Sequence, residues 1–339
     1  MSVEETMKTI ANELTGDYKK DIVYLQKQIE FYQDQENGEE IISLCKSIIT
    51  RIIPEEIKQD LPLAEDGFHL MGILDQAEVF LYKKEYEKSK ELLEPLVVKV
   101  DALVEYKPTA SYEYHNFNSF FEEILYRQLF ETEKEIRPTP GPFDKLFFLY
   151  GIALFNLGEL ENAAIALEKA SKWNPIDTSI GLQAAEVFKK QGNLEEFMNR
   201  TRAVFKHADT PNKVAKCYLN YGYYFIEKEL WNEAIFCYLL VLQFNRENRI
   251  AHGELALIQD RTGKKIEKVD MKALKEAAKK YNFSIWPDEN LIGIAFAYGK
   301  HTLENKEYDN ARYFLDIAYN LTKDKEIEKM LASIPKENK

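Results

Sequence analysis

The stretch that decides the fold runs from Asp144 to Asp177 and reads DKLFFLYGIALFNLGELENAAIALEKASKWNPID. Its apolar residues recur three and four positions apart, a spacing that is typical of amphipathic helices. Gly158 divides the stretch, because glycine tolerates the left-handed backbone conformation at the end of a helix. Pro175 marks the end of the second helix, since the residue before a proline is biased away from helix. The stretch therefore predicts two helices joined by a short turn.

The same pattern returns further along the chain. The dipeptide Tyr-Gly occurs three times, and in each case an alanine follows twelve residues after the glycine. Two antiparallel helices need small side chains where their backbones approach most closely, so we expect the glycine and the alanine to supply that space. The three pairs are Gly151 and Ala163, Gly222 and Ala234, and Gly299 and Ala311.

This spacing resembles the tetratricopeptide repeat (TPR) family, whose period is about 34 residues. The first and second of the three glycines lie 71 residues apart, which leaves room for a weaker copy between them. The resemblance implies an all-α fold, a right-handed α-α superhelix of about six helix pairs, three of them divergent. The residues that carry the resemblance in the strong copy are Phe147, Tyr150, Gly151, Leu154, Ala163, Leu167, Ala170 and Pro175, and those in the weaker copy are Ala185, Phe188, Gly192 and Phe197.

Breaks in the pattern predict the organisation of the chain. We expect an N-terminal helical capping region over 1–64, a divergent repeat over 65–105, an aromatic, proline-flanked insertion with one helix over 106–143, a repeat array over 144–330 with a divergent pair near 249–283, and a charged tail over 331–339. The insertion has two possible roles. Its aromatic rings either pack an added helix onto the solenoid, or they fold over the concave face and line or occlude it.

Composition restricts the possible partners. The chain has 57 acidic and 45 basic residues, and a net charge of −12 argues against binding to nucleic acid or to an anionic membrane surface. No stretch is apolar for long enough to span a bilayer, and the first residues do not form a basic signal start. We therefore expect a cytoplasmic location. Cys45, Cys217 and Cys237 are widely spaced and without a CxxC motif, which predicts buried reduced thiols.

Motifs for chemistry are missing from the sequence. The run Thr262-Gly263-Lys264-Lys265 lacks the upstream glycine of a phosphate-binding loop. The five histidines are scattered, and neither HExxH nor GxSxG occurs. We therefore predict that the chain is not an enzyme, and that it has no catalytic residues, no metal site and no cofactor.

The resemblance to TPR proteins implies instead a binding surface, because the first helix of each pair lines the concave face in that family. It predicts a scaffold or adaptor that holds an unidentified protein or peptide in this groove. The alternative is a peptide-responsive bacterial regulator of the helical-repeat receptor type, which short peptides would stabilise against heat. The predicted groove residues are Phe148, Ile152, Phe155 and Asn156, then Leu182, Glu186, Lys189 and Lys190, then Lys216, Leu219, Tyr223 and Glu227.

Two points qualify this predicted groove. Neighbouring repeats or the aromatic insertion would make Phe148 and Phe155 core residues if they covered them. Co-chaperones of the family carry a basic and amide clamp for a C-terminal carboxylate, but here Phe148 and Ile152 occupy its first positions. Lys216 and Asn220 lie in the right repeat without the rest of the set, so a carboxylate clamp is not predicted.

Overall fold

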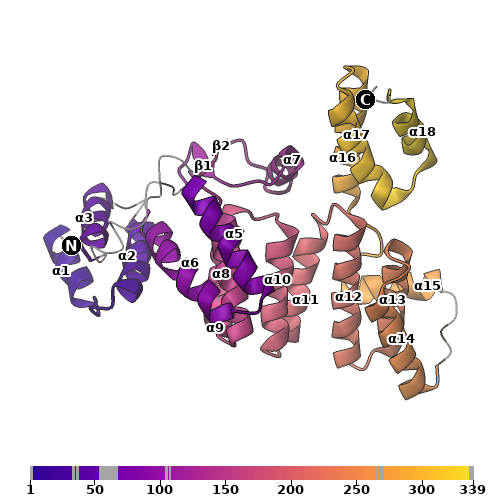
Figure 1. Ribbon diagram of the computed structural model, residues 1–339, viewed down its shortest axis with the longest axis horizontal. Helices are drawn as coiled ribbons and strands as arrows, with labels where there is room; N and C mark the ends of the chain where they lie inside the picture. Colours follow the sequence, from indigo (N-terminus) through magenta and orange to yellow (C-terminus); the bar gives the residue numbers. More distant parts are fainter. Residues whose placement is uncertain are drawn as a thin grey trace. The chain divides into compact units, whose positions relative to one another are not determined.

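The computed structural model describes residues 3–32, 35, 38–52, 68–103, 106, 108–264, 266 and 270–335. The chain divides into two compact units. Unit 1 comprises Met1–Asn116 and Lys134–Asn174, and unit 2 comprises Phe117–Glu133 and Pro175–Lys339. Both are built from helices that pack in consecutive pairs, which confirms the predicted all-α solenoid of helix pairs (Figure 1).

Unit 1 begins with three helices that share one apolar core. Ile22, Leu25 and Cys45 are fully buried there, and Val98 from a later helix joins them. Two helix pairs follow, and two strands of three residues pair in parallel between them. The helices are α1 (Val3–Asn12), α2 (Tyr18–Tyr32), α3 (Gly38–Ile52), α5 (Phe68–Tyr82), α6 (Tyr86–Asp101), α8 (Phe143–Leu157) and α9 (Leu160–Trp173), and the strands are β1 (Tyr112–Tyr114) and β2 (Glu135–Arg137).

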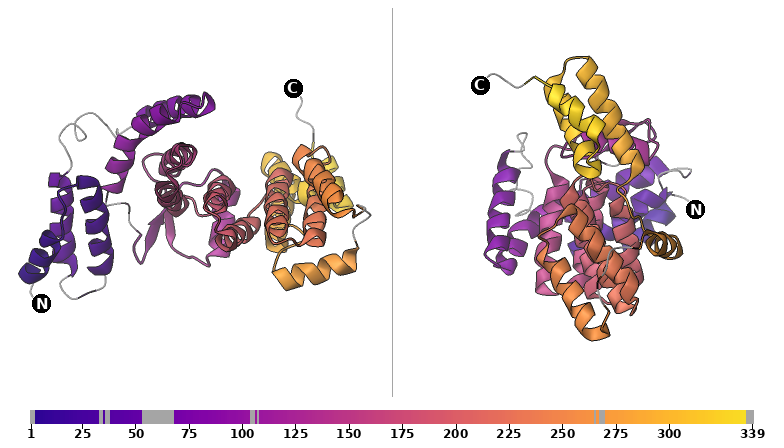
Figure 2. Two further views of the ribbon diagram at one scale, coloured as in Figure 1. Left: turned by 90° about the horizontal axis from the view of Figure 1, so that it is seen from below. Right: turned by 90° about the vertical axis from the view of Figure 1, so that its right-hand side faces the viewer.

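Unit 2 contains the remaining helices. Three of its pairs, α10 with α11, α12 with α13 and α16 with α17, pack side by side along their lengths. Helix α15 instead packs against α13 and crosses the neighbouring helices (Figure 2, left). The helices are α7 (Phe120–Leu129), α10 (Thr178–Lys190), α11 (Leu194–Phe205), α12 (Pro211–Glu227), α13 (Trp231–Phe244), α14 (Arg249–Thr262), α15 (Met271–Tyr281), α16 (Glu289–Glu304), α17 (Tyr308–Thr322) and α18 (Lys325–Ser333).

The repeated glycines mark the closest approach within a pair, as predicted, although the alanine is not their main neighbour. A β-carbon built on Gly222 would lie 2.6 Å from a ring carbon of Tyr238, sixteen residues later. At Gly151 and Gly299 the nearest atoms belong to the residues in the same position, Leu167 and Leu315. The glycine therefore makes room for a large side chain one helical turn beyond the alanine.

The predicted helix ends in the strong copy are also observed. Helix α8 stops at Leu157, and Gly158 follows with a left-handed φ of 85°. Helix α9 stops at Trp173, two residues before Pro175. These ends let α8 and α9 fold back on each other, which is the step that creates each pair.

The aromatic segment between α6 and α8 is divided: its two strands belong to unit 1, and Phe117–Glu133, which contains α7, belongs to unit 2. Phe121 of α7 is fully buried, and its ring lies 6.0 Å from the ring of Phe314 on α17. Asn118, just before α7, donates a hydrogen bond of 2.8 Å to Asp177, the residue that caps α10. Because solenoid repeats normally contact only their neighbours in sequence, this packing across about 190 residues is an addition to the repeat pattern.

Candidate functional site

In unit 1 the predicted groove positions share one face of α8. Phe148, Ile152 and Phe155 are half-buried and Asn156 is exposed. The side-chain amide of Asn156 donates a hydrogen bond of 2.9 Å to the backbone carbonyl oxygen of Ile152. The face thus offers three apolar side chains, partly accessible, beside one amide that is engaged with its own helix.

In unit 2 the predicted positions on α10 differ from one another in exposure. Leu182 is only 3% exposed and lies in the core, so it offers no surface to a partner. Glu186 and Lys189 are half-buried, and Lys190 is exposed. On α12, Leu219 and Tyr223 are half-buried, and Lys216 and Glu227 are exposed.

Four of these side chains come together in space, and we call Glu186, Lys189, Tyr223 and Glu227 the α10–α12 cluster. The ammonium nitrogen of Lys189 lies 4.1 Å from the centre of the Tyr223 ring. The same nitrogen is 3.5 Å from a carboxylate oxygen of Glu186. A cation over an aromatic face and beside a carboxylate is attracted by both, so Lys189 of α10 links Glu186 to Tyr223 of α12.

A buried aromatic ring of α11 contacts the cluster. Phe197 of α11 is fully buried, and its ring meets that of Tyr223 edge to face, with centres 5.8 Å apart. The sequence identified Phe197 only as a residue of the repeat consensus. Its spacing gave no indication that its ring contacts Tyr223. Tyr223 therefore contacts both the buried Phe197 ring and Lys189, whose ammonium nitrogen also lies 5.7 Å from the centre of the Phe197 ring.

The cluster is not tuned for proton transfer. Burial raises the pKa of Tyr223, and the carboxylates of Glu227 and Glu186 raise it further. A phenol with a raised pKa stays protonated at neutral pH, which makes it a poor general base. The arrangement is that of an oriented aromatic side chain with charges at its edge.

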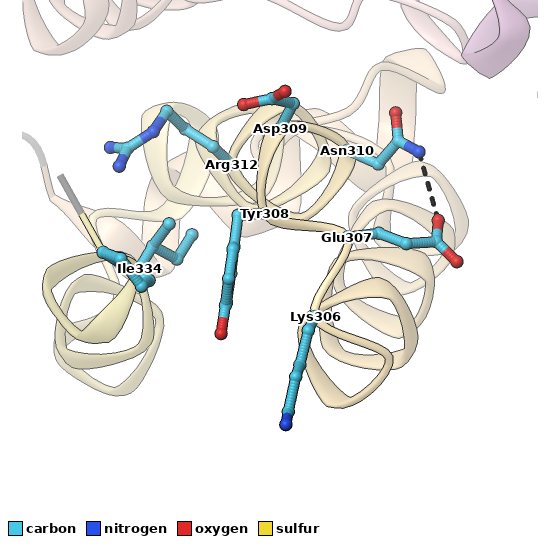
Figure 3. A pocket seen from close by; sticks show the side chains of 8 residues that line it. Lys306, Glu307, Tyr308, Asp309, Asn310, Arg312 and Ile334 are labelled. Atoms are coloured by element: carbon cyan, nitrogen blue, oxygen red, sulfur yellow. Dashed lines mark hydrogen bonds between the residues drawn. The ribbon is translucent and has the colours of Figure 1, made fainter. Parts of the chain in front are cut away.

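A hollow of about 870 Å³ lies at the start of α17 (Figure 3). Lys306, Tyr308 and Arg312 line it and are all exposed, and the side-chain amide of Asn310 donates a hydrogen bond of 3.1 Å to Glu307. Figure 3 shows Lys306 and Tyr308 extending in the same direction while Arg312 points elsewhere. The lining groups do not converge on one point, so this hollow is a weaker candidate than the cluster.

The buried titratable groups are dispersed through the cores. Burial lowers the pKa of His207 to about 4 and raises that of the Cys217 thiol to about 12. All three cysteines are buried and unbridged, as predicted.

In the described parts of the chain, no three His, Cys, Asp or Glu side chains are placed to hold a metal ion. No helix within those parts has both the length and the apolar character that crossing a membrane requires.

Comparisons with known proteins find a similarity in structure only. No family model matches the sequence, and neither does any curated protein. Among solved structures the chain is similar to one in the crystal structure of the APC/C hetero-tetramer Cut9-Hcn1, at 12% sequence identity and a TM-score of 0.32. The match covers 98% of this chain but only 60% of that one. The helix packing described above shows that both units are built from consecutive helix pairs.

Proposed function

We propose that the chain is a protein- or peptide-binding scaffold and that the α10–α12 cluster of unit 2 contacts its partner. The observation that supports this most is the contact of Tyr223 with both the buried Phe197 ring and the Lys189 ammonium. Tyrosine is enriched among residues that dominate binding energy. A side chain that is already oriented loses less conformational entropy when the partner arrives.

The surface proposed for the partner extends along the first helices from this cluster. On α12 it includes Leu219 and Lys216, which precede Tyr223 by one and two turns. On α10 it includes Lys190 but excludes the buried Leu182. The half-buried residues of α8 form a similar face in unit 1. Apolar and aromatic anchors with charges at the edge are the composition expected of a peptide groove.

We also propose that the chain acts by binding without catalysing a reaction. The groups that meet in the cluster stabilise one another, since the Lys189 ammonium pairs with Glu186 and lies over the Tyr223 ring. A catalytic site would need a nucleophile or base poised near neutral pH, and the shift of Tyr223 is in the opposite direction.

A peptide-display selection tests the proposed surface. Peptides selected on the full-length chain are synthesised with a fluorophore, and their affinities are measured by anisotropy. Because a central tyrosine contributes about 2 kcal/mol or more when truncated, Tyr223→Ala should weaken binding by about thirtyfold. The control is Tyr313→Ala, which removes a tyrosine of α17 that is 42% exposed.

Circular dichroism first establishes that both variants keep the helical content of the wild type. Selected peptides that bind all three proteins with equal affinity would remove the cluster from the proposed binding surface. Retention by Tyr223→Ala together with loss in Phe155→Ala would move the surface to α8.

A further inference from the structure

Unit 1 contains a cavity whose lining includes none of the predicted groove residues. Its volume is about 460 Å³, and its walls come from α2, α6, α8 and α9. Val97, Phe147 and Ala166 are buried and form an apolar floor. Val23 and Ile165 also line it, yet they are 38% and 56% exposed, which places them at the rim. Ligand sites are typically concave and apolar with a few polar groups of this kind.

Carboxylates outnumber ammonium groups on the cavity wall. Asp17, Glu94 and Asp101 line it together with Lys20 and Lys169, which leaves an excess of one carboxylate. Lys20 pairs with Asp17 at 3.4 Å, and Lys169 pairs with Asp101. The hydroxyl of Tyr150 donates to Glu94 across 3.5 Å. Since the local balance is negative, the cavity favours a cation over an anion.

Lys169 shows how a cationic side chain is held at this cavity. The ammonium of Lys169 pairs with Asp101 at 2.5 Å and lies 5.6 Å from the centre of the Phe147 ring. Both side chains of the ion pair are largely buried. A cationic head with its aliphatic stem against apolar surface is therefore stable at the edge of this cavity.

The charge of the surrounding sequence acts in the same direction. Unit 1, residues 1–116 and 134–174, carries 18 Lys and Arg against 29 Asp and Glu, a net charge of −11. Unit 2 carries 27 against 28, a net charge of −1. The acidic excess of the whole chain thus resides almost entirely in the unit that forms the cavity, where it raises the local concentration of basic partners.

We propose that this cavity binds an arginine or lysine side chain from a basic segment of a partner protein. The aliphatic stem lies on Val97, Phe147 and Ala166, and the charged head approaches Glu94. The exposed rim residues Val23 and Ile165 contact apolar residues that flank the basic one, a contact that a free amine does not supply. This site is separate from the α10–α12 cluster and does not depend on it.

Direct binding to the full-length chain tests the proposal. The probe is a short fluorescein-labelled peptide of leucine, alanine and arginine, and its counterpart carries glutamate in place of arginine. The arginine peptide should bind, with an affinity that falls as sodium chloride is added. Glu94→Gln and Ile165→Ala should each weaken it by about tenfold. Glu91→Gln is the matched control, because Glu91 is an exposed carboxylate of the same helix outside the cavity.

Each other result has a defined meaning. Equal loss in Glu94→Gln and Glu91→Gln would show a diffuse acidic field and overturn the site, as would binding of the glutamate peptide. Cadaverine that displaces the peptide at equal concentration would overturn the assignment to a protein segment. Urea unfolding checks that Glu94→Gln is folded. If this variant does not fold, the peptide affinity of Ile165→Ala still tests the cavity. Tyr223→Ala should retain this peptide, so failure here is distinguishable from failure of the α10–α12 surface.

Discussion

Substituting Gly222 by alanine should destabilise unit 2, although alanine is the better helix former. A β-carbon at this position would lie 2.6, 2.8 and 2.9 Å from three ring carbons of Tyr238. Contacts this short require movement, and the ring is only 2% exposed within the core between α12 and α13. The added methyl group therefore forces the two helices apart or displaces the ring.

The magnitude follows from two opposing contributions. Adding a methyl group to a packed core costs about 1–3 kcal/mol. Replacing glycine by alanine inside a helix contributes about 1 kcal/mol in the other direction. Gly253 on α14 provides the second contribution alone, because a β-carbon added there would meet no neighbouring atom within 4 Å. The difference in unfolding free energy between Gly222→Ala and Gly253→Ala thus isolates the steric effect, at about 1–3 kcal/mol.

Urea denaturation followed by circular dichroism measures this difference, provided that the unfolding slopes of the variants agree. A double-mutant cycle adds a stricter test, since Gly222→Ala should cost nothing once Tyr238→Ala has removed the ring. If Gly222→Ala proves as stable as Gly253→Ala, then the glycine is not required by close packing and the physical explanation of the repeat is wrong.

Three further results are expected. Phe121→Ala should lower the unfolding free energy of the chain by about 3–5 kcal/mol and Phe120→Ala by less than about 1 kcal/mol, because the first ring is fully buried and the second is 63% exposed; urea unfolding would contradict this if the two were alike. Burial lowers the pKa of His207 in the folded chain to about 4 from 6.5, so the unfolded chain binds its proton more readily. The free energy of unfolding should therefore fall by about 3 kcal/mol in total as the pH drops from 6.5 towards 4. A His207→Gln variant with the same pH dependence would refute this. The thiols of Cys217 and Cys237 should fail to react with a disulfide reagent at pH 8 until the chain is unfolded, because both are buried and burial raises the pKa of each.

The helix pairs were predictable because their cause is local. Gly158 and Pro175 end helices through backbone geometry that does not depend on the rest of the chain. The glycine at the centre of each first helix has a repeated position because its partner lies at a fixed distance along the sequence. Sequence reasoning placed the alanine in that space, whereas the structure shows a larger side chain one turn later.

The candidate sites were predictable only in part. The spacing along α10 and α12 identified Glu186, Lys189, Tyr223 and Glu227, but it could not show that Lys189 lies over the Tyr223 ring or that Leu182 is buried. Those facts depend on the angle between helices in different pairs. The repeat spacing did not predict the cavity of unit 1, because its walls come from four helices and its lining residues range from Asp17 to Lys169.

The sequence by itself determined the all-helical pairing, the helix ends and the reduced cysteines, since each follows from short-range spacing and residue type. Only the tertiary structure decided where the aromatic segment packs. Phe121 reaches Phe314 on α17 and Asn118 reaches the cap of α10, contacts that no periodic pattern encodes. The physical reason is the separation in sequence between the residues that interact. A repeat specifies the neighbouring helix against which each helix packs, whereas the position of an insertion depends on surfaces that exist only after the repeats have stacked.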